Sequence, residues 1–142
     1  MTGINTGKVV AGGLVAGLVA NVIDFVTNMY VLAGDWEALA RDHNLDPAAM
    51  TSPNVAMTWV VIDFLFGILL VWTYAAMRPR LGPGPTTAIS AGLVIYIATT
   101  LVVFGFTMMG VFTMTLFVKG SIAAIVSVLA ASIAGASVYR EA

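Results

Sequence analysis

Apolar residues dominate four long stretches of the chain, which short polar segments separate. The four stretches cover roughly residues 9–33, 55–77, 88–109 and 112–139. Each is at least as long as the ~20 helical residues that cross a hydrocarbon core about 30 Å thick. Hydrophobic residues make up 60% of the 142 residues, charged residues only 9%, and the mean hydropathy is +0.99. The pattern predicts an all-α fold, a single membrane domain built as a four-helix transmembrane bundle.

The polar segments between these stretches hold residues that start and stop helices. Gly34 and Asp35 are expected to end the first helix, and Pro53 is expected in the first turn of the second. The sequence Leu-Gly-Pro-Gly-Pro at residues 81–85 predicts the turn before the third helix. Gly110 alone marks the last turn, which must therefore be tight.

The basic residues predict how the chain is oriented. Four of them flank the side that holds both chain ends: Lys8, Arg78, Arg80 and Arg140. Cytoplasmic segments of membrane proteins carry an excess of Lys and Arg. We therefore expect a multi-pass protein of a bacterial cell inner membrane with both termini cytoplasmic, the 34–54 connection outside and the 78–86 turn inside.

The outer connection is rich in polar residues and predicts one further helix. Trp36, Leu39 and Ala40 lie at helical spacing and would form the apolar face of a short segment that Asp35 caps. We expect this short external amphipathic helix to lie on the outer membrane surface.

The single histidine lies in the same connection, between acidic residues. Asp42, His43 and Asp46 are of types that can coordinate a metal ion, but a lone histidine among surface acids is more often solvated. The favoured interpretation is a solvated segment, so neither a metal site nor a cofactor is expected.

Two carboxylates inside the membrane spans are the most unusual feature of the sequence. The tetrapeptide Val-Ile-Asp-Phe occurs at residues 22–25 and 61–64, which places Asp24 in the first span and Asp63 in the second. An acidic residue at the centre of a bilayer costs about 3 kcal/mol unless it is paired, wetted or protonated. Counted from the predicted outer ends of the two helices, both carboxylates lie about 13 Å deep and should face one another.

Further polar residues are expected around this acidic pair. Lys119 lies about seven residues into the fourth span, ~10 Å deep on the same side, and would complete an Asp–Lys–Asp cluster. Asn21 and Asn28 share one face of the first helix with Asp24, because they are three and four residues away from it. The sequence therefore predicts a buried polar site, suited to an ion or a proton, at Asp24, Asp63, Lys119, Asn21 and Asn28.

Small residues at helical spacing predict close packing between the spans. Gly13 and Gly17 form the four-residue spacing that lets membrane helices approach, and Gly67 lies on a comparable stripe of the second span. Gly120 and Gly135 bound a smooth face of small residues along the fourth span. The opposite side of the first helix is apolar and suits contact with lipid or with other helices.

Composition limits the functions that such a bundle can perform. The sequence contains no cysteine, which excludes thiol chemistry, and no nucleophile–base pair, phosphate loop or metal cluster indicates an enzyme. A net charge of −1 gives no reason to expect nucleic acid as a partner. We expect a non-enzymatic structural or accessory protein whose partners are the lipid bilayer and a second copy (a homodimer) or a larger membrane complex. The alternative is a dimeric proton- or cation-coupled carrier or channel that uses Asp24 and Asp63.

Two segments carry a resemblance to a known family. The first helix reads Gly-Gly-Leu-Val-Ala-Gly at residues 12–17, followed by Asn21 and Asp24, and the inner turn reads Tyr-Ala-Ala-Met-Arg-Pro-Arg-Leu-Gly-Pro-Gly at residues 74–84. Both are similar to segments of small, uncharacterised bacterial four-span integral membrane proteins, to which no activity is attached. The resemblance covers most of the chain and implies the four-span fold and the membrane location.

Overall fold

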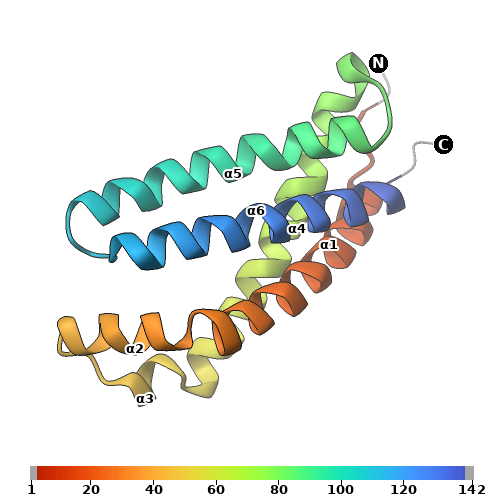
Figure 1. Ribbon diagram of the computed structural model, residues 1–142. Coiled ribbons are helices and arrows are strands. Elements are labelled where there is room, and N and C mark those ends of the chain that lie inside the picture. Colours follow the sequence, from red (N-terminus) through yellow and green to blue (C-terminus); the bar gives the residue numbers. More distant parts are fainter. Residues whose placement is uncertain (1–2, 140–142) are drawn as a thin grey trace.

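The computed structural model describes residues 3–139 of the chain (Figure 1). Helical segments follow one another through this range: α1 (Thr6–Val26), the π-helical η1 (Thr27–Val31), α2 (Ala33–Asp42), α3 (Pro47–Met50), α4 (Pro53–Leu81), α5 (Pro85–Met108) and α6 (Met114–Val138). No strand occurs among the described residues. Four helical segments, beginning at α1, α3–α4, α5 and α6, are long and apolar enough to cross a membrane. The predicted all-α four-helix bundle is confirmed. Arg140, one of the basic residues used for the orientation, lies outside the described residues.

The first span ends at Val31, close to the predicted residue 33, but the chain stays helical beyond it. Helix α1 passes into the π-helical turn η1, bends at Leu32, and continues as α2 from Ala33. Gly34 and Asp35 therefore lie inside the first turn of α2 instead of terminating the span. The predicted cap by Asp35 is wrong, because Leu32 is the N-cap residue of α2. Asp35 lies in the first turn instead, where an acidic side chain interacts favourably with the helix dipole.

The turn between α4 and α5 is shorter than the predicted 78–86 segment. Helix α4 runs through Pro79 to Leu81 and ends at Gly82, whose φ of +82° lies in the left-handed region that favours glycine. Helix α5 begins at Pro85, since proline is well accommodated in the first turn of a helix. The last turn is tight, as predicted, and Gly110 adopts a φ of +83° there.

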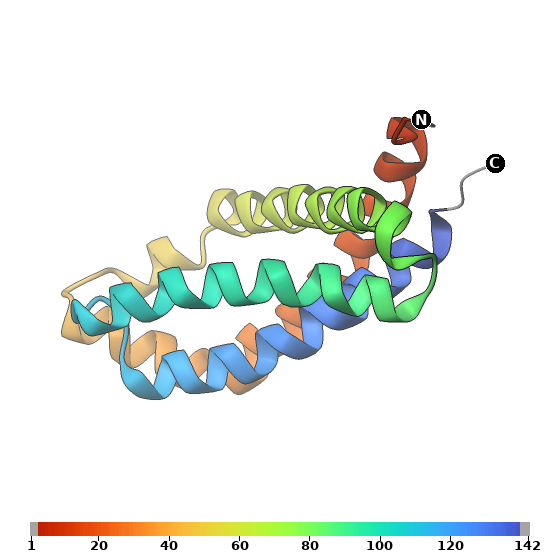
Figure 2. The same ribbon diagram turned by 90° about the horizontal axis from the view of Figure 1, so that it is seen from above.

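Helix α1 is the centre of the bundle. Its most extensive contacts are with α4 and α6, whereas α5 packs mainly on α6. Figure 2 shows α5 and α6 running side by side as an antiparallel hairpin, and both views place the start of α1 and the end of α6 at the same end of the bundle. The fold is thus two antiparallel helix pairs that meet along α1 and α6.

Glycines allow the backbones of α1 and α4 to touch. A Cβ atom on Gly13 would lie 2.6 Å from Cα of Ile68, and one on Gly17 would lie 2.7 Å from Cα of Phe64. A Cβ atom on Gly67 would overlap the backbones of Gly13 and Gly17. The three glycines therefore mark one point of close helix crossing.

A second close contact joins α1 to α6. A Cβ atom on Gly12 would lie 2.7 Å from the carbonyl oxygen of Gly135, so these helices also meet backbone to backbone. Gly120 differs from its predicted packing role, because a Cβ atom there would meet nothing within 4 Å. Crossed helices approach closely at one point only, and Gly120 lies about four turns away from Gly135.

The outward side of α1 is apolar and exposed. Exposed fractions of 48% to 60% occur at positions spaced three to four residues apart: Leu14, Leu18, Val22 and Phe25. This face is the one that the sequence assigned to lipid or to other helices. Polar and small side chains of α1 consequently point toward α4 and α6.

Replacing Gly67 with alanine should destabilise the bundle. The added methyl would overlap backbone atoms of α1, which cannot move aside as a flexible side chain can. Overpacking of this kind costs about 1–3 kcal/mol, and we expect the melting temperature in detergent to fall by about 5 °C or more.

Gly120→Ala is the matched control, because its added methyl has open space. Alanine is the better helix former, so the control should melt at or slightly above the wild-type temperature. Equal melting temperatures for both variants would contradict the close crossing of α1 and α4.

Candidate functional site

The crossing of α1 and α4 fixes the register of the two acidic residues. Gly17 packs against Phe64, and one turn further along, the side-chain amide of Asn21 donates to the carbonyl oxygen of Val60 at 3.3 Å. Because the helices are antiparallel, moving one residue forward along α1 corresponds to moving one residue backward along α4.

In this register the acidic residues are not at the same level. Asp24 lies level with Met57 of α4. Met57 and Asp63 are six residues apart, and this separation corresponds to about 9 Å along the helix axis. The predicted equal depth is therefore wrong. The prediction counted residues from the outer ends of the two helices as if these ends were level, whereas the contacts at the glycines set the register.

The two side chains nevertheless converge on one layer of the bundle. Asp24 and Asp63 lie three residues on either side of the level at which Asn21 meets Val60. In a helix every Cα–Cβ bond tilts toward the N-terminus, so side chains of two antiparallel helices lean toward each other here. Both carboxylates thus lean toward the layer of Asn21.

Electrostatic and polar contacts agree with this convergence. The charge of Asp24 acts on Asp63, and both side chains are half-buried. The side chain of Ser127, which is 2% exposed on α6, interacts with the Asp24 carboxylate. Helices α1, α4 and α6 therefore each contribute a polar side chain to one site, which we call the acid site: Asp24, Asp63, Asn21 and Ser127.

The two predicted asparagines bind backbone carbonyls instead of the carboxylates. The Asn21 amide donates to Gly17 at 2.9 Å as well as to Val60, and the Asn28 amide donates to the carbonyl oxygen of Asp24 at 2.8 Å. A short amide side chain reaches the carbonyl one turn earlier more easily than a neighbouring side chain. The side chain of Asn21 thus links α1 to α4, and the side chain of Asn28 stabilises the helical turn that contains Asp24.

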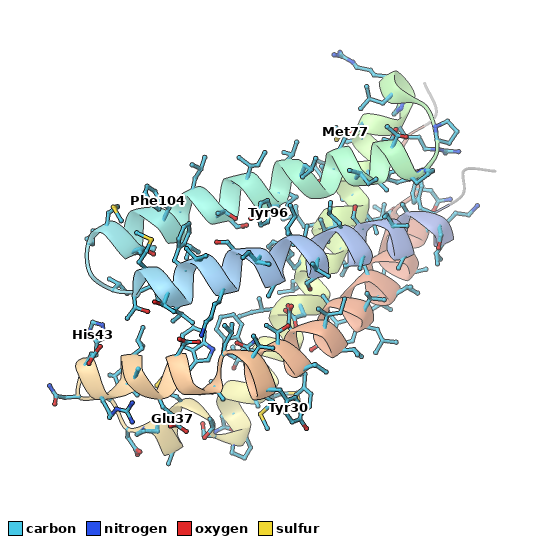
Figure 3. The ribbon with its side chains drawn as sticks, in the orientation of Figure 1. Tyr30, Glu37, His43, Met77, Tyr96 and Phe104 are labelled. Atoms are coloured by element: carbon cyan, nitrogen blue, oxygen red, sulfur yellow. The ribbon has the colours of Figure 1, made fainter. Side chains whose placement is uncertain are left out.

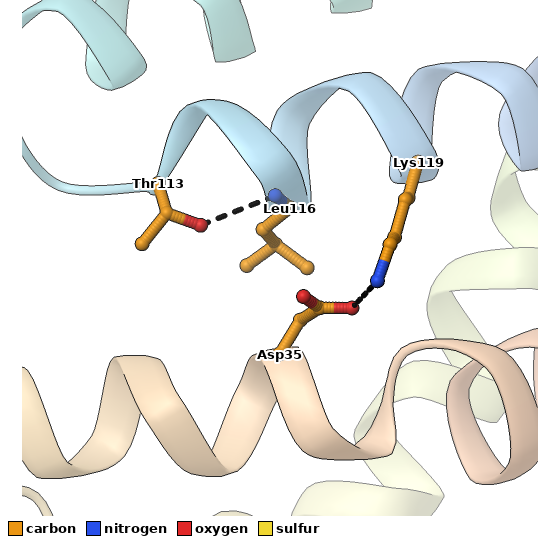
Figure 4. Close-up of polar contacts among 4 residues, drawn as sticks. All are labelled: Asp35, Thr113, Leu116 and Lys119. Carbon is orange, nitrogen blue, oxygen red and sulfur yellow. Dashed lines mark hydrogen bonds and ion pairs between the residues drawn. The ribbon is translucent and has the colours of Figure 1, made fainter.

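Lys119 lies outside the acid site, contrary to the predicted Asp–Lys–Asp cluster. Its ammonium group forms an ion pair with Asp35 of α2 at 2.8 Å (Figure 4). The physical reason is that the chain stays helical after the first span, so that α2 follows η1 and lies alongside the first turns of α6. A carboxylate that the sequence placed in a surface connection thereby reaches Lys119.

Helix α2 is the amphipathic helix that the sequence predicted, but it runs along α6. Leu39 and Ala40 are buried and Trp36 is half-buried, as their spacing indicated. The rings of Trp36 and Phe112 meet edge to face, with their centroids 6.5 Å apart. Figures 1 and 2 both show α2 beside the N-terminal half of α6, where the sequence predicted a helix flat on the membrane surface.

The outer acidic residues and His43 make structural contacts. The Nε2 atom of His43 lies 3.1 Å from the carbonyl oxygen of Val111, and Asp46 caps α3 by accepting from the amide of Ala48. Figure 3 shows His43 at the far end of α2, close to the turn that joins α5 and α6. Within residues 3–139, no group of three His, Cys, Asp or Glu side chains is suited to hold a metal ion.

Comparison of the chain with protein-family models, with curated proteins and with solved structures finds no match. The resemblance to small four-span proteins of bacteria stays a prediction. The acid site and the contacts around it are therefore the basis for a functional assignment.

Proposed function

We propose that the protein is a non-enzymatic integral protein of a bacterial inner membrane in which Asp24 and Asp63 bind a proton or a small cation. One observation carries this proposal: the two carboxylates converge, while Lys119, the cation expected to neutralise them, is engaged by Asp35. Two negative charges in a membrane span cost about 3 kcal/mol each. A shared proton or a bound cation removes much of that cost.

Protonation or cation binding within a bilayer is the chemistry of proton-coupled and cation-coupled carriers and channels. Four spans are few for a complete transport path, so a carrier or channel of this kind would act as a dimer. The exposed apolar outer half of α5, which includes Leu101, Val102 and Phe106, leaves area for a second copy as well as for lipid.

A purely structural role is the second candidate. The interaction between Ser127 and Asp24 favours it, because a polar contact of this kind holds α6 to α1. A neutral amide in place of the carboxyl keeps a polar group that can make this contact. Asparagine substitutions therefore separate the two functions.

The paired variant Asp24→Asn with Asp63→Asn should abolish binding and flux while leaving the fold intact. A hydrophobic carbodiimide reacts with protonated carboxyl groups, and mass spectrometry of the wild type should locate the adduct at Asp24 or Asp63. In proteoliposomes, proton or cation flux of the wild type should exceed that of the paired variant by at least about tenfold.

Glu37→Gln is the matched control, since Glu37 is an exposed acid of α2 away from the acid site. It should keep the wild-type labelling and flux. Wild-type protein without carbodiimide labelling, or a paired variant with undiminished flux, would refute the proton or cation site and leave the structural role.

The orientation belongs to the same proposal, with α3 outside and the turn between α4 and α5 in the cytoplasm. Lys8, Arg78 and Arg80 support it, because they lie at the end of the bundle where α1 begins and where α4 and α6 end. Because the sequence contains no cysteine, single cysteines can be placed and labelled at exposed positions of α3 and of the first turn of α5. In intact cells an impermeant maleimide should label Ala49→Cys and not Thr86→Cys, and the reverse result would invert the orientation.

A further inference from the structure

The junction between α1 and α2 has the geometry of a hinge. The π-helical turn η1 begins three residues after Asp24, and the amide of Leu32 donates five residues back to Thr27 at 2.9 Å. Such turns interrupt the regular hydrogen-bond ladder of a helix and occur frequently at functional sites. The chain can therefore change direction just beyond the acid site.

Beyond this hinge, α2 is held on α6 by few contacts. Leu32 and Leu39 pack on Leu116 in an apolar cluster that is separate from the main core, with the ion pair between Asp35 and Lys119 beside it. Lys119 is 47% exposed, so the protein encloses the ion pair only in part, and the pair adds little to the attachment of α2. The contact between α2 and α6 is also far smaller than the one between α1 and α4.

A hydrogen-bonded chain connects α2 to the acid site. The indole N–H of Trp36 donates to Oδ1 of Asn28 at 2.8 Å, and the amide of the same Asn28 donates to the carbonyl oxygen of Asp24 at 2.8 Å. Because one asparagine makes both bonds, displacement of Trp36 removes one of the two partners that hold the Asn28 side chain in place. The position of α2 and that of the acid site are thus linked through Asn28.

We propose that α2, hinged at residues 27–32, is a latch that closes the outer side of the acid site when it is docked on α6. Its release frees Asn28 from Trp36, loosens the last turn of α1 and admits water or cations to Asp24. The part of this proposal that concerns the acid site rests on the proposed function, whereas docking of the latch on α6 does not.

Charge reversal at Asp35 tests the latch. Asp35→Lys faces Lys119 with a like charge, and the exchanged pair Asp35→Lys with Lys119→Asp restores attraction. Glu37→Lys makes the same charge change on an exposed position of α2 and serves as the control. All variants are made with Trp59→Phe and Trp72→Phe, so that Trp36 is the single fluorescent tryptophan.

Docking is measured by emission and quenching of Trp36, and access to the acid site by the rate of carbodiimide labelling at Asp24 at one fixed pH. Asp35→Lys should shift the emission of Trp36 to the red and raise the labelling rate at least threefold, and the exchanged pair should reverse both effects. In the protein without charge substitutions, high salt should also shift the emission of Trp36 to the red and raise the labelling rate of Asp24, since salt screens a half-exposed ion pair. The salt measurement uses the protein with its own charges, so its result does not depend on whether a charge variant folds.

Each contrary outcome identifies what fails. Unchanged Trp36 fluorescence, both in Asp35→Lys and in high salt, overturns the latch. A shift of Trp36 without a change in labelling overturns its coupling to the acid site but leaves the proposed function intact. No labelling of Asp24 or Asp63 in any variant overturns the proposed function, and with it the coupling, whereas the fluorescence still decides whether α2 docks as proposed.

Discussion

The close crossing of α1 on α4 is the constraint on which the rest of the structure depends. Gly13, Gly17 and Gly67 let the two backbones touch, and no other residue type leaves room for that contact. The contact fixes the register of the antiparallel pair within one residue, since a shift would bring side chains against the opposite backbone. The place of Asp24 and Asp63 in the bundle follows from this register.

Much of the bundle could be predicted from the sequence, because hydrophobic length and helical spacing act locally. Four apolar stretches gave the spans, and the spacing of Leu14, Leu18 and Val22 gave the outward face of α1. Gly13 and Gly17 were recognisable from their four-residue spacing. Each of these features depends only on residues within a few turns of one another.

The site was harder to predict, because its geometry depends on contacts between distant segments. The six-residue offset between Asp24 and Asp63 could not be obtained by counting from the helix ends, because the outer ends of η1 and α4 do not lie level with one another. The pairing of Lys119 with Asp35 requires α2 to continue from η1, and no residue of 27–31 signals a π-helical turn. Ser127 stood out in the sequence only as one small residue in a smooth face.

The acid site lies where the most tightly packed part of the bundle gives way to a loosely attached segment. Toward one end, α1 is held by glycine contacts with α4 and α6. Toward the other, it continues through η1 into α2, which makes few contacts. Groups that bind and release a proton or a cation need both a fixed geometry and a route to water. The glycine contacts supply the fixed geometry, and release of α2 is the route that we propose.

The central claim is that Asp24 and Asp63 act as one site. Solid-state NMR of the side-chain carboxyl carbon of Asp24 in lipid bilayers, followed through a pH titration, tests it most directly. If the two groups share a site, the titration midpoint of Asp24 moves when Asp63 is replaced by asparagine and stays in place when Glu37 is replaced by glutamine. An Asp24 titration that is identical in the wild type and in Asp63→Asn would contradict the account, and the two carboxylates would then be independent polar residues.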